Sequence, residues 1–171
     1  MNEKANSLLW WVIPGVLAGM PMPFIHWERR MNHGAPLAAY DDDFPILHSA
    51  GIRAVVCLLN IPTDEPVYRA AGFDFLCLPI ADGAAPVTDQ VTQFVQFVSN
   101  QRQHQRPVAV HCEAGFGRTG TMIAAYLISQ GDTALGAIGR VREIERVAVE
   151  TREQILFLEQ YARATDRGNR D

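Results

Sequence analysis

The sequence has few of the features that mark several classes of protein. Only three cysteines occur in 171 residues, without a CxxC pair, so neither a disulfide framework nor a cysteine-ligated metal site is expected. The low count favours a reducing, cytoplasmic setting. The net charge is only −4, which gives no basic face for nucleic acid and no polybasic patch for a membrane.

Long hydrophobic runs are also lacking. The only candidate for a membrane segment, LLWWVIPGVLAGM at residues 8–20, is too short to span a bilayer, and Pro14 interrupts it. The charges before it cancel, so a signal peptide is not expected. We interpret residues 10–13 and 16–18 as two short strands around a Pro-Gly turn.

The apolar pattern predicts an α/β fold. Runs rich in aliphatic and β-branched residues indicate buried strands at 52–59, 73–80 and 107–111. The helices that we expect run from a cap at Thr88 to about 105, from 119 to 129, from a cap at Asp132 to about 146, and from a capping box at Thr151 to about 164.

Strands alternate with helices early in the chain, and helices cluster late. This order predicts a central, mostly parallel twisted sheet flanked by helices, with four C-terminal helices on one side. The strand at 107–111 is expected at the centre. The length suits one domain over residues 1–171, with its core at about 8–164.

Two local features are expected to be structural. The acidic run of residues 41–43 is interpreted as a solvated helix start, where negative charge faces the positive helix end, and not as a metal site. Cys57 and Cys77 lie inside apolar runs and are interpreted as buried, inert thiols.

The stretch HCEAGFGRTG, residues 111–120, separates Cys112 from Arg118 by five residues. Because a strand ends and a helix begins here, the backbone must turn tightly, and Gly115 and Gly117 allow dihedral angles that side chains forbid. Successive N–H groups then face inward and form a nest for an oxyanion such as phosphate. The N-terminus of the helix adds its positive dipole end.

The same nest is expected to activate the thiol. A cysteine at a helix N-terminus among hydrogen-bond donors ionises readily, so Cys112 can attack phosphorus without a dedicated base. Arg118 can fork two hydrogen bonds onto phosphate oxygens. Thr119 can donate its hydroxyl to the sulfur. His111 either orients the loop through hydrogen bonds or is a satisfied core histidine.

Asp82 is the candidate general acid. It lies in PIADGAAP, residues 79–86, after a predicted strand and before a predicted helix. Gly83 and Pro86 flank it in a loop able to close over a site. An aspartate here is often only a turn residue, but its place before Cys112 favours the catalytic interpretation. It could later act as the base that activates water.

HCEAGFGRTG resembles the HCxxGxxR[ST]G signature of protein tyrosine and dual-specificity phosphatases. The segments WVIPGVLAG, PIADGAAPVTDQ and ETREQ extend the similarity to small atypical dual-specificity phosphatases of the VHZ type, from about residue 10 to 161. The resemblance implies a cysteine-dependent phosphatase fold, with Cys112 as nucleophile, Arg118 as phosphate clamp, Asp82 as acid and Thr119 tuning the sulfur. Backbone amides would come from Glu113, Ala114, Gly115, Phe116 and Gly117.

The resemblance leaves several roles open. Gln154 would position the hydrolytic water, or it serves only the capping box. Phe116 would stack on a phosphotyrosine ring, or it packs on its own loop. Val147 stands where many relatives carry proline. The short region 60–71 resembles no deep recognition loop, so the pocket is expected to be shallow enough for phosphoserine and phosphothreonine.

The resemblance also implies the substrate and partners. We expect hydrolysis of phosphotyrosine, and also of phosphoserine and phosphothreonine, on proteins or peptides, with phosphate or another oxyanion in the loop. No cofactor or metal is required. Glu113 would repel the extra phosphates of phosphoinositides. We expect a cytoplasmic monomer without nucleic-acid or membrane partners.

Two other classes fit less well. Rhodanese-like and arsenate-reductase-like enzymes also use a cysteine in an anion loop, but their loop or the position of their cysteine differs. A catalytically dead module that only docks phosphorylated partners would usually lack the thiol, the arginine or the acid, and all three are present here.

Overall fold

A five-stranded sheet forms the centre of the computed structural model, which describes residues 8–23, 43–60 and 65–168. The strand order is β1-β2-β5-β3-β4, with β1 antiparallel to β2 and the other neighbours parallel. The strands are β1 (Trp10–Ile13), β2 (Leu17–Met20), β3 (Ala54–Leu59), β4 (Asp74–Ile80) and β5 (Val108–His111). The prediction of a mostly parallel sheet, with the strand before Cys112 at its centre, is confirmed.

The register brings the carboxyl ends of three strands to one edge of the sheet. Met20 of β2 and Cys57 of β3 both pair with His111, the last residue of β5. Cys112 therefore leaves the sheet between two neighbouring strands, at the edge where parallel sheets place their ligand sites.

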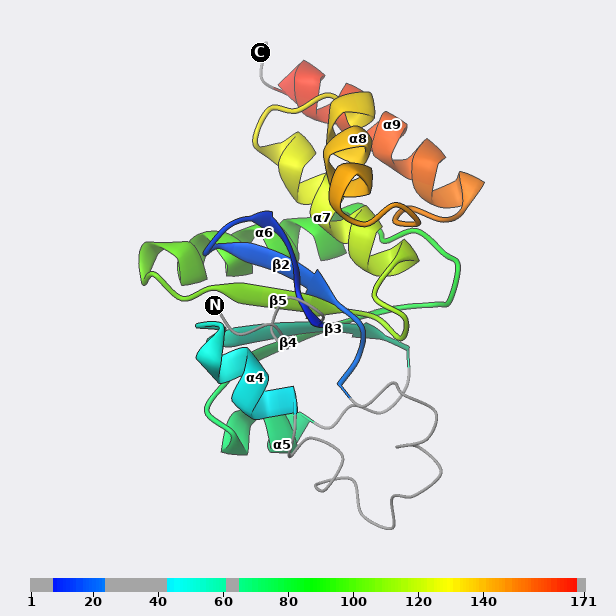
Figure 1. Ribbon diagram of the computed structural model, residues 1–171. Coiled ribbons are helices and arrows are strands. Elements are labelled where there is room, and N and C mark those ends of the chain that lie inside the picture. The colour runs from blue at the N-terminus through cyan, green and yellow to red at the C-terminus, as the bar shows by residue number, and fades with distance from the viewer. Residues whose placement is uncertain (1–7, 24–42, 61–64, 169–171) are drawn as a thin grey trace.

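Helices cover both faces of the sheet (Figure 1). Four lie on one face and two on the other, and the side chains of β3 alternate between these layers, with Val56 and Leu58 facing the four helices and Val55 facing the two. The first group is α6 (Thr88–Gln103), α7 (Gly117–Ser129), α8 (Ala134–Ile144) and α9 (Arg152–Gly168), and the second is α4 (Asp43–Ser49) and α5 (Glu65–Ala70). The predicted four-helix layer is confirmed.

Helix α7 is buried on all sides. Every residue from Gly117 to Ile128 is buried, between the sheet, α6, α8 and α9. At Gly120 the connection between α8 and α9 comes so close that a Cβ would lie 2.7 Å from the Cβ of Ala148. The start of α7, which follows Cys112 in the chain, is thus held in place by packing.

The start of α8 differs from the prediction. Asp132 was expected to cap this helix, but the N-cap is Thr133, whose hydroxyl oxygen accepts a hydrogen bond from the N–H of Gly136 at 3.1 Å. The carboxylate of Asp132 instead pairs with Arg140 at 2.6 Å. Both residues suit a helix start, and only the backbone path decides between them.

The starts of α6 and α9 are close to those predicted. Helix α6 begins at Thr88, but its N-cap is Val87, whose N–H donates to the side-chain oxygen of Gln90 at 3.0 Å. The capping box of α9 is formed as predicted. Thr151 Oγ1 accepts from the N–H of Gln154 at 3.2 Å, and Gln154 Oε1 accepts from the N–H of Thr151 at 3.2 Å.

The features expected to be structural are partly confirmed. Asp43 opens α4 but is only 6 % exposed, so it is not solvated, and residues 41 and 42 lie outside the described residues. Cys57 is buried as predicted, and burial raises the pKa of its thiol to about 12. Cys77 is half-buried in β4. No helix of the described residues is long and apolar enough to cross a membrane.

We predict that Leu158→Ala lowers the free energy of unfolding by about 2–5 kcal/mol, because it leaves a cavity under α9. Leu158 is fully buried, whereas Leu156 on the same helix is 42 % exposed. The matched variant Leu156→Ala should change stability by no more than about 0.5 kcal/mol. Urea unfolding of both variants measures the difference, and equal losses would contradict the packing of α9 described above.

Candidate active site

The turn from β5 into α7 forms a loop of residues 112–118, here called the anion loop. Gly115 adopts a φ of +84°, and a Cβ there would lie 2.5 Å from backbone atoms of Met20 and Pro21. Gly115 is thus required both by its conformation and by the close approach of β2. Gly117 was expected to need a special conformation, but its φ is not positive. A Cβ there would meet only the carboxylate end of Glu150, an exposed side chain that can move aside, and the amide of Gln154.

Cys112 lies at the base of the anion loop. It is 3 % exposed, and its Sγ accepts a hydrogen bond from the N–H of Gly115 at 3.3 Å. The carbonyl of Glu113 accepts from the N–H of Met22 at 3.0 Å, which fixes the outer part of the loop to the segment after β2. Ala114 and Phe116 are half-buried, and Phe116 is the N-cap of α7.

Arg118 connects the anion loop to the end of β4. Its side chain is only 6 % exposed, and its Nη1 donates to the carbonyl of Ile80 at 3.1 Å. Its Nη2 lies 2.8 Å from the Oδ1 of Asp82, whose side chain is 90 % exposed. The structure therefore brings together Arg118 and Asp82, which are far apart in the sequence.

Asp82 belongs to residues 81–87, here called the acid loop. Together with Glu113 and Arg118 it lines a cavity of about 430 Å³. Met22 and Asn60 also line this cavity; Asn60 begins the region 60–71 that was considered as part of the pocket, whereas no sequence pattern indicates Met22. Residues 61–64 of the predicted short loop lie outside the described residues.

His111 forms two hydrogen bonds behind the anion loop. Its Nδ1 lies 3.0 Å from the carbonyl of Cys112, and its Nε2 lies 3.2 Å from the hydroxyl of Tyr68. Since a carbonyl only accepts, Nδ1 carries the hydrogen and Nε2 accepts from Tyr68. Burial lowers the pKa of His111 to about 4, helped by the charge of Arg118. His111 is therefore a satisfied core histidine that is bonded to the first carbonyl of the anion loop, and its role in orienting that loop stays a prediction.

Tyr68 was missed by the sequence analysis. A buried tyrosine needs a partner for its hydroxyl, but nothing in the local pattern of α5 connects it with His111, which is 43 residues away. The pairing follows only from the packing of α5 beneath the sheet.

Thr119 is fully buried in the first turn of α7. Within the part of the chain that the structure describes, its hydroxyl has no hydrogen-bond partner, so the expected bond to the Cys112 sulfur is not formed here. The role of Thr119 stays a prediction.

Gln154 faces the acid loop from α9. Its Oε1 accepts from the N–H groups of Glu150 at 2.9 Å and Thr151 at 3.2 Å, and its Nε2 donates to the carbonyl of Ala84 at 3.3 Å. The side chain is fully buried. The capping box is therefore present, and its role toward a water stays a prediction.

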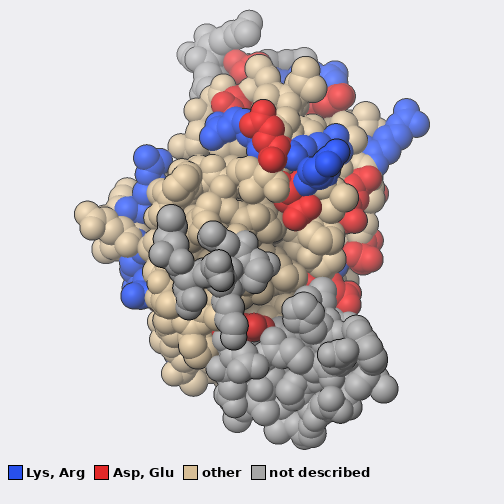
Figure 2. All heavy atoms as spheres, in the orientation of Figure 1, with Lys and Arg blue, Asp and Glu red and all other residues tan. Residues whose placement is uncertain are grey.

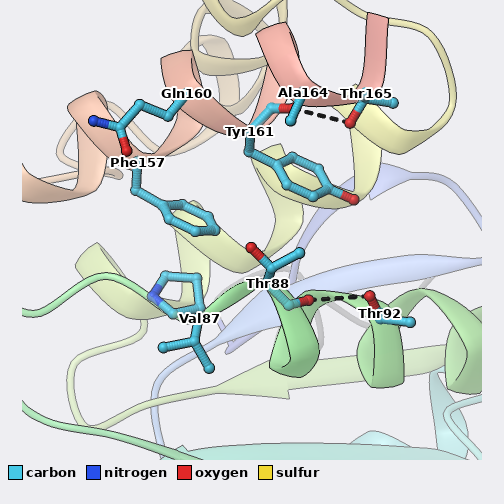
Figure 3. Close-up of a pocket in the computed structure, with 9 residues that line it drawn as sticks. Val87, Thr88, Thr92, Phe157, Gln160, Tyr161, Ala164 and Thr165 are labelled. Atoms are coloured by element: carbon cyan, nitrogen blue, oxygen red, sulfur yellow. Dashed lines mark hydrogen bonds between the residues drawn. The ribbon is translucent and has the colours of Figure 1, made fainter. Parts of the chain in front are cut away.

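A second cavity, of about 640 Å³, lies outside the expected site, between the start of α6 and α9. Figure 3 shows Phe157 and Tyr161 of α9 facing Val87 and Thr88 across it.

Over α8 and α9, acidic and basic side chains are interspersed on the face shown in Figure 2. No group of three or more potential metal ligands occurs within residues 8–23, 43–60 and 65–168.

Comparisons with known proteins agree with the geometry. A family model described as "Polymorphic toxin system, DSP-PTPase phosphatase" matches residues 31–132. The chain is 30 % identical to "Probable protein tyrosine phosphatase type IVA A" of Dictyostelium discoideum, over 86 % of this chain and 92 % of that protein. It is 35 % identical to "Tyrosine-protein phosphatase cdc-14" of Caenorhabditis elegans over 77 % of this chain, but spans only 18 % of that longer protein.

Solved structures show the same fold. The crystal structure of a mutant form of Tk-PTP matches with a TM-score of 0.75 and 26 % identity, over 94 % of this chain and 98 % of that chain. The structure of DUSP15 matches with a TM-score of 0.73 at 18 % identity, over 95 % and 92 % of the two chains. With the turn around Cys112, these matches show that the chain belongs to the small atypical dual-specificity phosphatases of the protein tyrosine phosphatase family, hydrolases that use a cysteine nucleophile.

Proposed function

We propose that this chain hydrolyses phosphate monoesters on proteins, on phosphotyrosine and also on phosphoserine and phosphothreonine, through a phosphocysteine at Cys112. The observation that carries the proposal is that the anion loop holds both Cys112 and Arg118, and that Asp82 is paired with Arg118. The Cys112 sulfur receives the Gly115 N–H at 3.3 Å, the Arg118 guanidinium is buried above the same loop, and Asp82 lies 2.8 Å from it.

In the first step the Cys112 sulfur attacks phosphorus, an S–P bond forms, and the P–O bond to the leaving group breaks. The inward N–H groups of residues 113–117 and the Arg118 fork hold the three phosphoryl oxygens, where charge is stabilised in the transition state. No metal is needed, because the positive charge and the donors come from the loop itself.

The leaving oxygen needs a proton, which we assign to Asp82. Without substrate, the carboxylate of Asp82 is paired with Arg118. A bound phosphate would take its place on the guanidinium, which frees the carboxylate of Asp82 to take up a proton from solvent and to donate it to the leaving oxygen. In the second step Asp82 accepts a proton from water, the water attacks phosphorus, and the S–P bond breaks.

Thr119 and Gln154 are proposed to assist the second step. The buried, unpartnered hydroxyl of Thr119 can donate to the sulfur as negative charge returns to it. Gln154 uses one amide hydrogen on Ala84, which leaves the second for the attacking water.

The charges at the cavity favour phosphoproteins over phosphoinositides. Asp82 and Glu113 both line it, and two carboxylates there disfavour ligands with additional phosphates. The net charge of −4 and the mixed surface support a cytoplasmic enzyme without nucleic-acid or membrane partners, and we propose that it acts as a monomer.

Cys112→Ser is expected to abolish turnover of a chromogenic aryl phosphate while phosphate binding remains, because a serine hydroxyl is not ionised at neutral pH. Steady-state kinetics and calorimetric titration with inorganic phosphate measure the two properties. Cys77→Ala, which changes a half-buried thiol in β4, is the matched control and should keep wild-type turnover. An active Cys112→Ser variant would exclude the phosphocysteine.

Asp82→Asn is expected to slow hydrolysis of phenyl phosphate by about 10²–10⁴-fold, the usual contribution of a general acid. Dinitrophenyl phosphate should be affected far less, because its leaving group needs no proton. The comparison of kcat for the two substrates tests the assignment. Equal losses for both would remove Asp82 from the acid role.

The low pKa of His111 predicts a pH-dependent stability. Between about pH 6.5 and about pH 4, His111 binds a proton in the unfolded chain but stays neutral in the folded chain. The free energy of unfolding therefore falls as the pH is lowered. His111→Asn keeps a donor for the Cys112 carbonyl but cannot titrate, so its slope should be shallower in this window. Urea unfolding across the window compares the two slopes, and identical slopes would contradict the burial of a neutral imidazole.

A further inference from the structure

Three consecutive residues that follow Asp82 are each hydrogen-bonded by a side chain at the start of α9. Thr151 Oγ1 donates to the carbonyl of Gly83 at 2.9 Å, and Gln154 Nε2 donates to the carbonyl of Ala84 at 3.3 Å. Glu153 Oε1 accepts from the N–H of Ala85 at 3.2 Å. The middle of the acid loop is therefore held by one turn of a helix that lies 68 to 70 residues later in the chain.

The same turn lies against the anion loop. A Cβ on Gly117 would be 3.2 Å from Nε2 of Gln154, and it would collide with the carboxylate of Glu150. One element thus contacts both loops, so its position sets the separation between Asp82 and the groups around Cys112.

The acid loop has further contacts outside α9. Gln90 links the end of β4 to the end of the acid loop, since its Nε2 donates to the carbonyl of Pro79 at 2.7 Å and its Oε1 accepts from the N–H of Val87 at 3.0 Å. Within the loop, the N–H of Ala84 donates to the carbonyl of Ala81 at 3.1 Å, and Asp82 is paired with Arg118 at 2.8 Å. The 640 Å³ cavity lies beside Val87, which is 60 % exposed (Figure 3). The bonds to the start of α9 therefore add to a local turn and to the pairing with Arg118.

The chain enters this turn through a strained residue. Val149 has a φ of 59°, which a β-branched residue rarely adopts. Arg142 of α8 holds the strained segment, with Nε donating to the carbonyl of Ala148 at 2.9 Å and Nη2 to that of Val149 at 2.7 Å. Strain that is held by surrounding bonds typically occurs where a position matters for function.

We propose that Thr151, Glu153 and Gln154 form a positioning clamp that holds the acid loop so that Asp82 reaches the leaving oxygen. The inference rests on the proposed function, since it takes Asp82 as the acid. Glu153 is a positioning residue and not a catalytic one, because it is exposed and its hydrogen bond within the described residues goes to the backbone of the loop.

Glu153→Ala removes the acceptor for Ala85 without touching the core. It should lower kcat for phenyl phosphate by about 3–10-fold, the effect expected from one lost hydrogen bond, and leave KM and the turnover of dinitrophenyl phosphate within about twofold. Glu159→Ala is the matched control, an exposed glutamate on α9 that pairs only with Arg163, and should leave both substrates unchanged. Equal losses of Glu153→Ala for both substrates, or no loss, would overturn the clamp.

A double-mutant comparison separates this inference from the proposed function. In the Asp82→Asn background, Glu153→Ala should cause no further loss with phenyl phosphate, because the group that it positions is already inactive. A full additional loss would overturn the clamp while Asp82 remains the acid. If Asp82→Asn alone affects both substrates equally, the acid assignment itself fails.

Conservative variants distinguish positioning from folding. Glu153→Gln keeps an oxygen that can accept from Ala85 and should retain wild-type turnover of phenyl phosphate. Thr151→Ser keeps the hydroxyl bonded to Gly83, whereas Thr151→Val does not, so only the second should show the leaving-group-dependent loss. Urea unfolding of each variant shows whether α9 remains folded. A Thr151→Ser variant as slow as Thr151→Val would contradict the role of the hydroxyl.

Discussion

The active site depends on close backbone contacts around the turn from β5 into α7. Gly115 lies against the backbone of β2, Gly117 against the carboxylate of Glu150, and Gly120 against Ala148. These contacts come from different parts of the chain. At Gly115 the neighbour is backbone, which leaves no room for a Cβ, so the end of β2 fixes the path of the anion loop at this point.

Burial alone does not make a thiol reactive in this molecule. Cys57 and Cys112 are equally hidden at neighbouring positions of the same sheet edge, and burial raises the pKa of the Cys57 thiol to about 12. The two sulfurs have different surroundings. Cys112 receives an N–H from its own loop, and the same loop carries Arg118, a buried cation that needs an anion. In this structure the carboxylate of Asp82 is the anion that pairs with Arg118, and a bound phosphate can replace it there.

The sequence predicts what short-range patterns determine. Glycine positions and the spacing of Cys112 and Arg118 define the anion loop, apolar runs locate the strands, and the Thr151 capping box locates α9. Contacts made by packing are not visible in the same way. Asp132 and Thr133 are equally good caps until the backbone path is known. Tyr68 reaches His111 only because α5 packs beneath the sheet. That the Thr119 hydroxyl finds no hydrogen-bond partner among the described residues is likewise not visible in the sequence.

The two halves of the proposed chemistry come from different places in the chain, and α9 connects them. The anion loop is built locally by β5 and α7, but the acid loop follows β4 and reaches the cavity from another direction. A single helix turn is bonded to Ala84 of the acid loop and lies close to Gly117 of the anion loop, so it holds the two loops relative to each other. Because that turn is preceded by a strained Val149 held by Arg142, its position is overdetermined by α8 as well as by its own capping box. The C-terminal helices therefore contribute to the placement of Asp82, in addition to burying one face of the sheet.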